Sequence, residues 1–333
     1  MTPAPAPVPA AGGALPPGPD RERVDAATVR RRRAVTPGMC GPSALLLGRI
    51  GDWTWETVAD VCELDVLRAR NESGDPAYLS FFYYRVRGSL GYHLRSPGFG
   101  DRLDILSRVF GFGSESVHTV HRISDESRAP ALPPFLEPDD FYAPPPPGCL
   151  HAETFNRWVS RGRAGSNRGL HRASPPGFRH GHLPRLPERH SPRLAYGRAR
   201  SLLTFVDDPA RPCRVVAEDL TATHTVDPVS DLNGVGLVYF AAYFTIVDRA
   251  LLAGWRALGR AEPDFLARAV TDQQICYLGN ADPGTRLETA VRVRAAVSGP
   301  PTEVWDAVVR DAGSRELIAV CTQLVPTNPQ EER

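Results

Sequence analysis

Two long apolar stretches, one in each half of the chain, constrain the fold more than any other feature of the sequence. The first runs from residue 44 towards 62 after a Pro-Gly-Met-Cys-Gly-Pro segment, and the second covers 237–258 after Asp-Leu-Asn-Gly-Val-Gly. Each is followed by a Gly-x-Arg-Leu segment, starting at Gly100 and Gly284, that leads into alternating apolar and polar residues. A helix with apolar residues on most faces is expected where a sheet wraps around it. The order therefore predicts one long helix and one curled antiparallel sheet, present twice.

The strands of this plan are expected in runs rich in aromatic and β-branched residues. In the first half, residues 78–87 form such a run. The helix before it is expected to begin at Ser43, with a break near Gly51 because glycine weakens helices. In the second half, the helix is expected over 235–258. The other predicted strands are 102–110, 115–123, 199–207, 213–225, 272–278, 286–297, 302–311 and 316–324.

The chain has 333 residues, which is enough for two domains of ordinary size. Residues 1–36 are predicted to be a disordered tail, because they begin Pro/Ala/Gly-rich and include the arginine run 30–33, interpreted as a solvated charge cluster. Residues 37–150 are the first predicted domain and 196–326 the second. Residues 151–195, which are rich in arginine and proline, are predicted to be a basic linker between them.

Composition argues against several kinds of protein. No apolar run of about 18 residues lacks a charge, so no membrane span is expected. The first residues lack the basic and apolar regions of a secretory signal, and we therefore expect a cytoplasmic protein. The net charge of +1 and the Pro/Gly-broken basic stretch argue against a nucleic-acid partner.

Cysteine and lysine usage restricts the chemistry. The six cysteines form no C-x-x-C pair and the sequence has no H-E-x-x-H motif, so no metal site is predicted and reduced thiols are expected. All 39 residues counted as lysine or arginine are arginine. Schiff-base catalysis and a lysine general base are therefore excluded.

The opening of the second apolar stretch resembles a known motif. Residues 231–240, Asp-Leu-Asn-Gly-Val-Gly-Leu-Val-Tyr-Phe, are similar to the D-x-N-G-H-V-N-N-x-x-Y segment that begins the helix of hot-dog thioesterases. They differ at Val235 and Gly236, where those enzymes carry His-Val. The resemblance implies an α+β double hot-dog fold, in which two curled antiparallel sheets each wrap a long central helix. Proteins of this fold mostly act on acyl thioesters of coenzyme A or of acyl carrier proteins.

Six segments, in the same order, are similar to the leinamycin-type bifunctional acyltransferase/decarboxylase family of polyketide biosynthesis. They are 37–42 (PGMCGP), 51–55 (GDWTW), 77–79 (AYL), 155–159 (FNRWV), 174–179 (SPPGFR) and 272–282 (DQQICYLGNAD). The resemblance covers most of the chain from about 36 to 324. Members of this family take methylmalonyl-CoA, release carbon dioxide and pass a propionyl group to the phosphopantetheine thiol of an acyl carrier protein. The resemblance implies that activity here, in a monomer or a homodimer, with no cofactor besides the coenzyme A of the substrate.

In this family the acyl group is expected to form an ester with a tyrosine, and the residue at the matching position is Tyr78. Its neighbour Ala77 stands where a hydroxyl residue is expected. A phenol with a pKa of about 10 needs activation at neutral pH. Amides of the helix opening at 38–41, or Arg85 and Arg87 on the same strand, are candidates for that role. The alternative is that Tyr78 is only a half-buried strand aromatic.

Loss of carbon dioxide leaves an enolate, which needs hydrogen-bond donors at the thioester oxygen. Amides at a glycine-led helix start suit that role, so the candidates are Asn233, Gly234 and Gly236, with Gly41 as the equivalent in the first half. The alternative is that these glycines only permit close packing. Asp231 is either a helix cap or a base for proton transfer. Four aromatic residues are either the lining of an apolar pocket or plain core: Phe81, Phe82, Tyr239 and Phe240.

Two rival functions remain open. A simple hot-dog thioesterase or dehydratase would turn over without a carrier protein, and the missing histidine after Gly234 argues against it. A non-catalytic acyl-CoA-binding or carrier-docking module would bind the thioester without turnover. The stretch 151–200, with eleven arginines and two acidic residues, is either a binding surface for carrier protein or coenzyme A, or a solvated linker. Three histidines on predicted strands are candidates for proton transfer: His118, His121 and His224.

Overall fold

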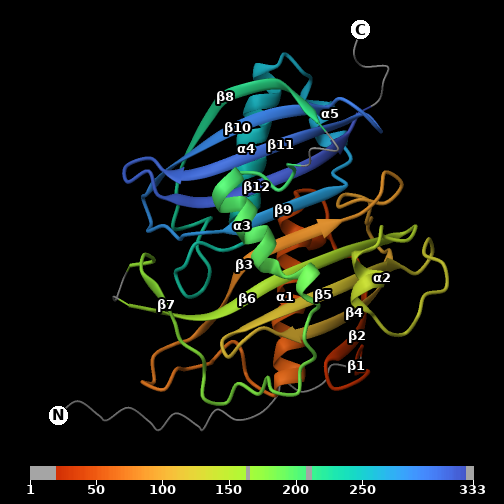
Figure 1. The fold of residues 1–333 in the computed structure, drawn as a ribbon, viewed down its shortest axis with the longest axis vertical. Helices are drawn as coiled ribbons and strands as arrows, with labels where there is room; N and C mark the ends of the chain where they lie inside the picture. Colours follow the sequence, from red (N-terminus) through yellow and green to blue (C-terminus); the bar gives the residue numbers. More distant parts are fainter. Residues whose placement is uncertain (1–19, 163–165, 208–211, 328–333) are drawn as a thin grey trace.

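The computed structural model describes residues 20–162, 166–207 and 212–327, and these form one curved sheet with helices on both sides (Figure 1). Every pair of neighbouring strands is antiparallel, as the registers between them require. The order across the twelve-stranded sheet is β1-β2-β4-β5-β6-β3-β9-β12-β11-β10-β8, with β7 paired to β6. Strands of the first half therefore lie next to one another in one part of the sheet, and strands of the second half make up the rest of it.

Each half supplies one long helix and several strands. The strands of the first half are β1 (Arg21–Arg23), β2 (Thr28–Ala34), β3 (Tyr78–Arg87), β4 (Arg102–Gly111), β5 (Ser116–Asp125), β6 (Cys149–Arg161) and β7 (Leu170–Arg172). Its helices are α1 (Ser43–Cys62), α2 (Pro138–Tyr142) and α3 (Pro192–Leu202), with short 3-10 turns at Pro37–Met39 and Glu188–His190. The second half has β8 (Cys213–Thr225), α4 (Ala242–Ala257), α5 (Glu262–Ala267), β9 (Asp272–Tyr277), β10 (Arg286–Ala296), β11 (Thr302–Asp311) and β12 (Leu317–Pro326).

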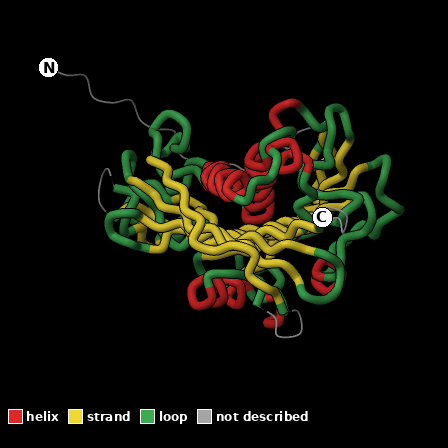
Figure 2. The backbone as a smooth tube through the Cα atoms, turned by 90° about the horizontal axis from the view of Figure 1, so that it is seen from above, coloured by secondary structure: helices red, strands yellow, loops and turns green. Residues whose placement is uncertain are grey.

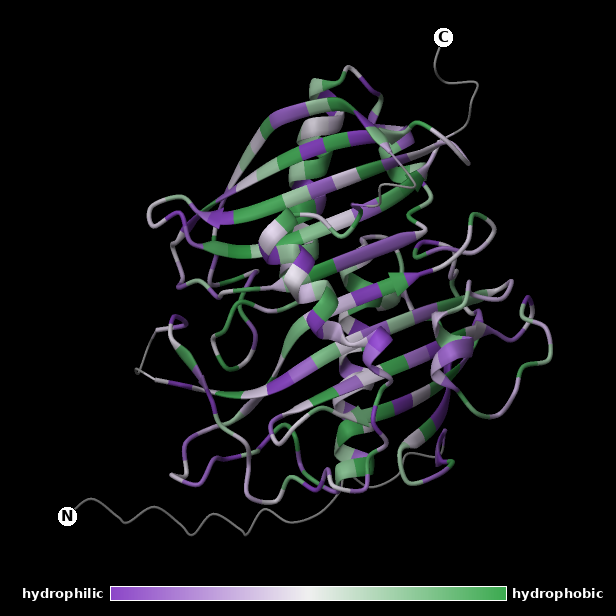
Figure 3. Cartoon of the chain, in the orientation of Figure 1, coloured by the Kyte–Doolittle hydropathy of each residue, from purple (hydrophilic) through white to green (hydrophobic). Residues whose placement is uncertain are grey.

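The two long helices pack against each other on one side of the sheet, which curves around them (Figure 2). The short helix α3 packs on β3 and β9 from the opposite side. Apolar and polar residues alternate along the strands (Figure 3), and the apolar ones meet the helices in a core that both halves share. The predicted order of a long helix followed by antiparallel strands thus occurs in both halves.

Helix α1 runs without a break through both of its glycines, so the break expected near Gly51 is wrong. A Cβ atom at Gly51 would lie 2.1 Å from Cζ of Phe240, and one at Gly48 would lie 3.1 Å from the hydroxyl of Tyr239. Glycine is needed here because the segment before α4 packs directly on the backbone of α1. The helix ends at Glu63, which adopts the left-handed conformation with φ of 53°.

The two halves join through a short pairing of β3 with β9. Only residues 83–87 of β3 pair with 272–276 of β9. Arg85 of β3 binds both carboxylate oxygens of Asp272 on β9, at 3.0 and 2.5 Å, and lies 3.8 Å from Glu153 on β6. These charges are largely buried, so the seam is held by ion pairs as well as by backbone hydrogen bonds.

The predicted tail is wrong for its described part, residues 20–36, which contain β1 and β2. The arginine run does not lie in solvent as a cluster, because alternate residues of a strand face opposite sides. Arg31 points under α1, is fully buried, and donates to Thr57 at 2.9 Å and Ser107 at 3.2 Å, while Arg30 pairs with Asp104 on β4. Burial lowers the pKa of Arg31 to about 10. Residues 1–19 of the predicted tail lie outside the described residues.

Three further expectations about segments are corrected. Residues 151–161 are not a linker but most of β6, an interior strand between β5 and β3, where Glu153 and neighbouring charges pair with partners on other strands. Residues 192–202 form helix α3 where a strand over 199–207 is predicted, with Pro192 at its first turn and Ser191 accepting from the amide of Arg193. Helix α4 begins at Ala242 rather than near 235.

Candidate active site

A cavity of about 490 Å³ lies where the two halves of the sheet separate. Because β3 pairs with β9 only from Tyr83 onward, the first residues of β3 and the chain beyond Tyr277 diverge and leave space between them. The cavity is lined by four segments: 78–82 of β3, 167–170 before and in β7, 233–238 without Gly236, and 277–280. Trp55 of α1, Phe240 before α4 and Tyr243 of α4 complete its inner end.

The inner end of the cavity is aromatic. Trp55, Phe81, Phe240, Tyr243 and Tyr277 all line it, and the rings of Phe81 and Phe240 stand 4.0 Å apart. The indole nitrogen of Trp55 donates to the carbonyl of Leu79, and the hydroxyl of Tyr277 donates to the carbonyl of Phe240. Burial raises the pKa of both Tyr243 and Tyr277, so both phenols stay neutral at physiological pH. This end therefore suits an apolar group.

Hydrogen-bond donors lie along the wall contributed by the second half. The side-chain oxygen of Asn233 accepts from the amides of Val235 and Leu237, at 3.1 and 3.0 Å. The side-chain oxygen of Asn280 accepts from the amide of Val238 at 3.3 Å. Within the described part of the chain, nothing accepts from the Gly234 amide or from the side-chain nitrogens of Asn233 and Asn280. These three donors are available to an oxygen atom in the cavity.

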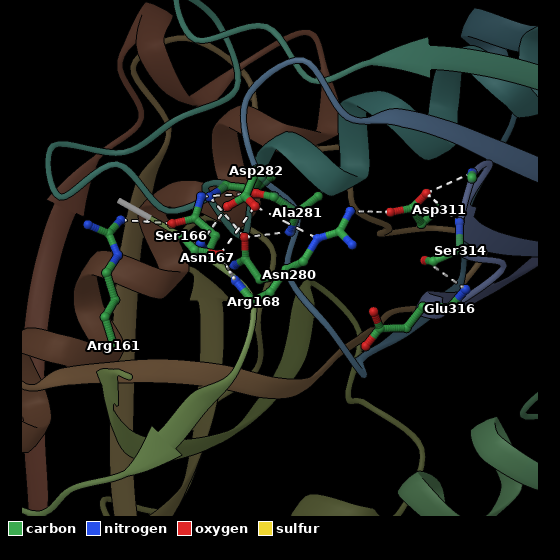
Figure 4. A network of polar contacts seen from close by, with 12 residues as sticks. Arg161, Ser166, Asn167, Arg168, Asn280, Ala281, Asp282, Asp311, Ser314 and Glu316 are labelled. Atoms are coloured by element: carbon green, nitrogen blue, oxygen red, sulfur yellow. Dashed lines mark hydrogen bonds and ion pairs between the residues drawn. The ribbon is translucent and has the colours of Figure 1, made fainter. Parts of the chain in front are cut away.

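Asn167 holds the two loops that carry these donors (Figure 4). Its side-chain nitrogen donates to the carbonyl of Gly236 at 2.8 Å and to that of Ala281 at 2.9 Å. Its side-chain oxygen accepts from Arg161 at 2.8 Å, and its own amide donates to Asp282 at 2.5 Å. The side chain of Asn167 is only 2% exposed. Because it bonds to both second-half loops, this first-half residue fixes their position.

The arginines beside the cavity make internal contacts. Arg161 also donates to the carbonyl of Val235 at 2.8 Å, and Arg168 binds Asp311 and lies 3.7 Å from Asp282 (Figure 4). Hydrogen bonds from the Ser314 and Gly313 amides, together with the charge of Arg168, lower the pKa of Asp311. Arg161 and Arg168 therefore tie the segment after β6 to the second half.

Tyr78 lies at the start of β3 and lines the cavity. Its side chain is half-buried, and no described residue hydrogen-bonds to its hydroxyl. The arginines expected to activate it lie elsewhere: Arg85 pairs with Asp272, and Arg87 donates to carbonyls of α2. They lie seven and nine positions along the extended strand from Tyr78, which is roughly 23 and 30 Å. The expectation that Arg85 or Arg87 activates Tyr78 is therefore wrong.

The structure brings Asn233 and Gly234 to the cavity but not Gly41 or Gly236. Gly41 precedes α1, has a φ of +94°, and is not among the lining residues. Nearby, Ser43 donates to Asp248 of α4 at 2.6 Å. The amide of Gly236 donates to the carbonyl of Asn233 at 2.9 Å, so it is not free to bind a substrate. Gly236 has a φ of +75°, which a turn requires and glycine allows.

Asp231 does not cap helix α4, because residues 231–239 form a loop closed by a bridge between Leu232 and Val238. Its carboxylate accepts from His224 at 2.6 Å and from the amide of Asp227 at 2.8 Å. Burial raises the pKa of Asp231, but these hydrogen bonds outweigh burial, so its pKa is lowered overall. Asp231 does not line the cavity, and it fixes the turn before the loop. The side chain of Asn233 binds the amides of Val235 and Leu237, which would otherwise belong to the start of the predicted helix.

The three candidate histidines lie outside the cavity as well. His224 binds Asp231. His118 lies 3.1 Å from Glu153 and 3.2 Å from the hydroxyl of Tyr142 in α2. His121 is buried under α1, between Ser107 and Thr54, and burial lowers its pKa to about 3. None of the three lines the cavity.

The sequence reasoning missed Asn167 and Asn280. Asn280 belongs to the segment 272–282 that carries the family resemblance, so that segment pointed to it. Asn167 lies in the stretch interpreted as a linker. Its partners in the second half, Gly236 and Ala281, are 69 and 114 residues further along the chain. No local pattern predicts such contacts.

Across residues 20–162, 166–207 and 212–327, no group of three or more His, Cys, Asp or Glu residues is arranged to hold a metal ion. The six cysteines are free thiols, and burial raises the pKa of Cys62 to about 12. Among the helices of the described segments, none has the length and apolar character needed to span a membrane.

Three solved thioesterase structures share the fold of this chain. A putative oleoyl thioesterase from Lactobacillus plantarum superposes with a TM-score of 0.59 at 11% identity, covering 92% of this chain and 98% of that one. An acyl-ACP thioesterase from Bacteroides thetaiotaomicron gives 0.55 at 10% identity, covering 90% and 97%. The 12:0-ACP thioesterase from Umbellularia californica gives 0.54 at 12% identity, covering 90% and 94%. At these identities the likeness concerns the fold alone.

Sequence comparison then gives the family. The profile of the LnmK N-terminal hot dog fold domain matches residues 30–207, more than half of the chain. The protein belongs to this family, which confirms the family predicted from the sequence motifs. No curated protein sequence matches the chain.

Proposed function

We propose that the protein is a double hot-dog enzyme that converts methylmalonyl-CoA to a propionyl group on an acyl carrier protein, with loss of carbon dioxide, in cytoplasmic polyketide biosynthesis. One observation carries the proposal. Tyr78 of the first half and the donors of Asn233 and Gly234 in the second half line the same cavity, although more than 150 residues separate them in the chain. A nucleophile and donors for a negatively charged oxygen are the two components that this reaction needs.

In the first proposed step, the hydroxyl oxygen of Tyr78 attacks the thioester carbonyl. The carbon–sulfur bond breaks, coenzyme A leaves as its thiol with the phenol proton, and the malonyl-type group remains as an ester on Tyr78. The negatively charged oxygen of the intermediate accepts hydrogen bonds from the Gly234 amide and the side-chain nitrogens of Asn233 and Asn280. Removing one such donor typically slows an enzyme by about 10²- to 10³-fold.

In the second proposed step, the bond from the α-carbon to the carboxylate breaks and carbon dioxide leaves. The electron pair forms an enolate, whose oxygen the same donors stabilise, and a proton then adds to the α-carbon. The aromatic inner end, with Phe81 and Phe240, gives the carboxylate few polar partners, which favours its loss. The thiol of the carrier-protein phosphopantetheine finally attacks the propionyl ester and restores Tyr78. No cofactor takes part, and a monomer or a homodimer can carry one such site per chain.

The decisive test follows the intact mass of the protein and the release of carbon dioxide after mixing with methylmalonyl-CoA. We expect a propionyl-sized adduct on Tyr78 that disappears on addition of holo acyl carrier protein. Tyr78→Phe should lose the adduct and at least 10³-fold in carbon dioxide release, because phenylalanine has no nucleophile. Tyr196→Phe, in α3 and away from the cavity lining, is the matched control and should behave like the wild type. Turnover without an adduct would contradict the tyrosine ester.

Hydrolysis is the second candidate. Glu316 is the one carboxylate among the described lining residues, and it lies in the turn before β12, where a carboxylate could act as a base for water. The three similar structures named above are thioesterases, which supports this alternative. It predicts free acid without carrier protein, and loss of that activity in Glu316→Gln. Tight binding of the thioester with no turnover would instead support a non-catalytic binding module.

A further inference from the structure

The aromatic inner end of the cavity stops at Phe240, and the structure gives a reason for its position. The ring of Phe240 lies between Phe81 at 4.0 Å and Trp55 at 5.8 Å, with Tyr84 at 6.0 Å behind it. All of these rings except Tyr84 line the cavity. Tyr84 is 1% exposed and is anchored by a hydrogen bond from its hydroxyl to the carbonyl of Leu47. Phe240 therefore separates the open cavity from a filled core.

The ring of Phe240 can pack against α1 because Gly51 has no side chain. Cζ of Phe240 would lie 2.1 Å from a Cβ atom at Gly51, and two further ring atoms would lie within 3 Å. Only glycine allows the ring to lie this deep against the backbone of α1. Any side chain at position 51 would push the ring back towards the cavity, where Phe81 already packs against it.

The polarity of the cavity fixes which part of a substrate meets Phe240. Gly234 is exposed and Asn233 and Asn280 are half-buried, so these donors lie nearer the solvent, whereas Phe240 and its neighbours are 7% exposed or less, apart from Trp55. A thioester oxygen bound by the donors leaves its acyl chain to extend into the aromatic end. The length that fits is then set by the distance from the donors to Phe240.

We propose that Phe240, seated on Gly51, is a specificity-determining residue that restricts this site to short acyl groups. The inference rests on the proposal that this cavity holds the acyl thioester, but it does not depend on decarboxylation or on the tyrosine ester. Removing the ring should open the cavity towards Tyr84 and admit longer chains. In an apolar pocket, one methylene that fits or fails to fit changes discrimination by about 10- to 200-fold.

The test measures binding rather than turnover, so that it can succeed even if the proposed reaction fails. The full chain is titrated by calorimetry with 2-oxoalkyl-CoA thioethers of increasing chain length, which cannot transfer an acyl group. The wild type should bind short chains tightest. Phe240→Ala should raise the affinity for hexyl-length relative to ethyl-length chains at least tenfold, and Phe240→Leu should do so less. Gly51→Ala should do the reverse and weaken all but the shortest chains.

Phe244→Ala is the matched control. Like Phe240, Phe244 is a buried aromatic that contacts Tyr84, but it lies within α4 and does not line the cavity. Its loss should lower stability without changing the chain-length profile. The inference is overturned if the profile of Phe240→Ala matches the wild type, if Phe244→Ala shifts it equally, or if the wild type binds no thioether or binds all lengths alike. Carbon dioxide release from methylmalonyl-CoA, assayed separately, decides the proposed reaction.

Discussion

Asn167 offers the sharpest test of how the cavity is organised, because it makes no proposed contact with substrate. In Asn167→Ala, the carbonyls of Gly236 and Ala281 lose hydrogen bonds of 2.8 and 2.9 Å, and Arg161 loses an acceptor at 2.8 Å. Leaving a buried polar group without its partner costs about 1–3 kcal/mol. With Ala281 buried and Asn167 itself almost inaccessible, we expect a loss of about 2–4 kcal/mol in the free energy of unfolding.

The catalytic effect should be larger than this stability loss suggests. The two loops that Asn167 holds carry Gly234 and Asn280, so both donors move when the loops relax. Misplacing such donors should lower kcat by about 10²-fold, the lower end of the effect of removing one. The KM for methylmalonyl-CoA should change much less, because donors to a developing charge act mainly in the transition state.

The assay is steady-state release of carbon dioxide at a temperature where unfolding curves show the variant to be folded. Ser166→Ala is the control, since it removes two neighbouring hydrogen bonds of 3.2 Å, one to Asp282 and one from the amide of Arg168, and leaves Asn167 in place. The reasoning is refuted if folded Asn167→Ala keeps kcat within about twofold of the wild type, or if KM alone changes.

Two further predictions concern stability. Arg85→Ala leaves Asp272 and the buried Glu153 without their shared partner, so unfolding in urea should show a loss of about 3–5 kcal/mol in the free energy of unfolding. Arg315→Ala, which breaks an exposed pair, should cost less than about 1 kcal/mol. Equal losses in the two variants would contradict the interpretation that buried ion pairs hold β3 to β9. Burial lowers the pKa of His121 from 6.5 to about 3, so the unfolded chain binds the proton first and stability should fall as the pH drops from about 6.5 to about 3. His121→Gln should make urea midpoints less dependent on pH in that range, and an unchanged slope would show that other groups cause it.

Local composition made much of the sheet predictable. Residues 78–87 and 302–311 were predicted with the bounds of β3 and β11, because both runs contain several aromatic or β-branched residues. Strand β6 was missed since its charged residues indicated a surface. Glu153 can be buried because Arg85, on another strand, neutralises it and Tyr142 of α2 donates a hydrogen bond to it. Such pairings depend on the register of the sheet, which the sequence does not give.

The site was predictable where one segment contributes it and unpredictable where two segments meet. Tyr78, Asn233 and Gly234 were named from motifs, and all three line the cavity. The start of α4 was misplaced by about seven residues, because the side chain of Asn233 binds the amides of Val235 and Leu237, which the predicted helix would use. The contacts of Asn167 join distant parts of the chain, and no pattern along one segment reports them.

The segment before α4 lines the cavity and the segment before α1 does not, and this difference affects how the chain can change during evolution. At the start of α1, Ser43 instead donates a hydrogen bond to Asp248 of α4, which Arg268 also binds. In an assembly of two identical subunits, every substitution would alter both positions at once. A chain that carries both helices is free of this coupling. Mutations around Gly41 can improve folding while those around Gly234 tune chemistry, so stability and substrate choice can be selected separately.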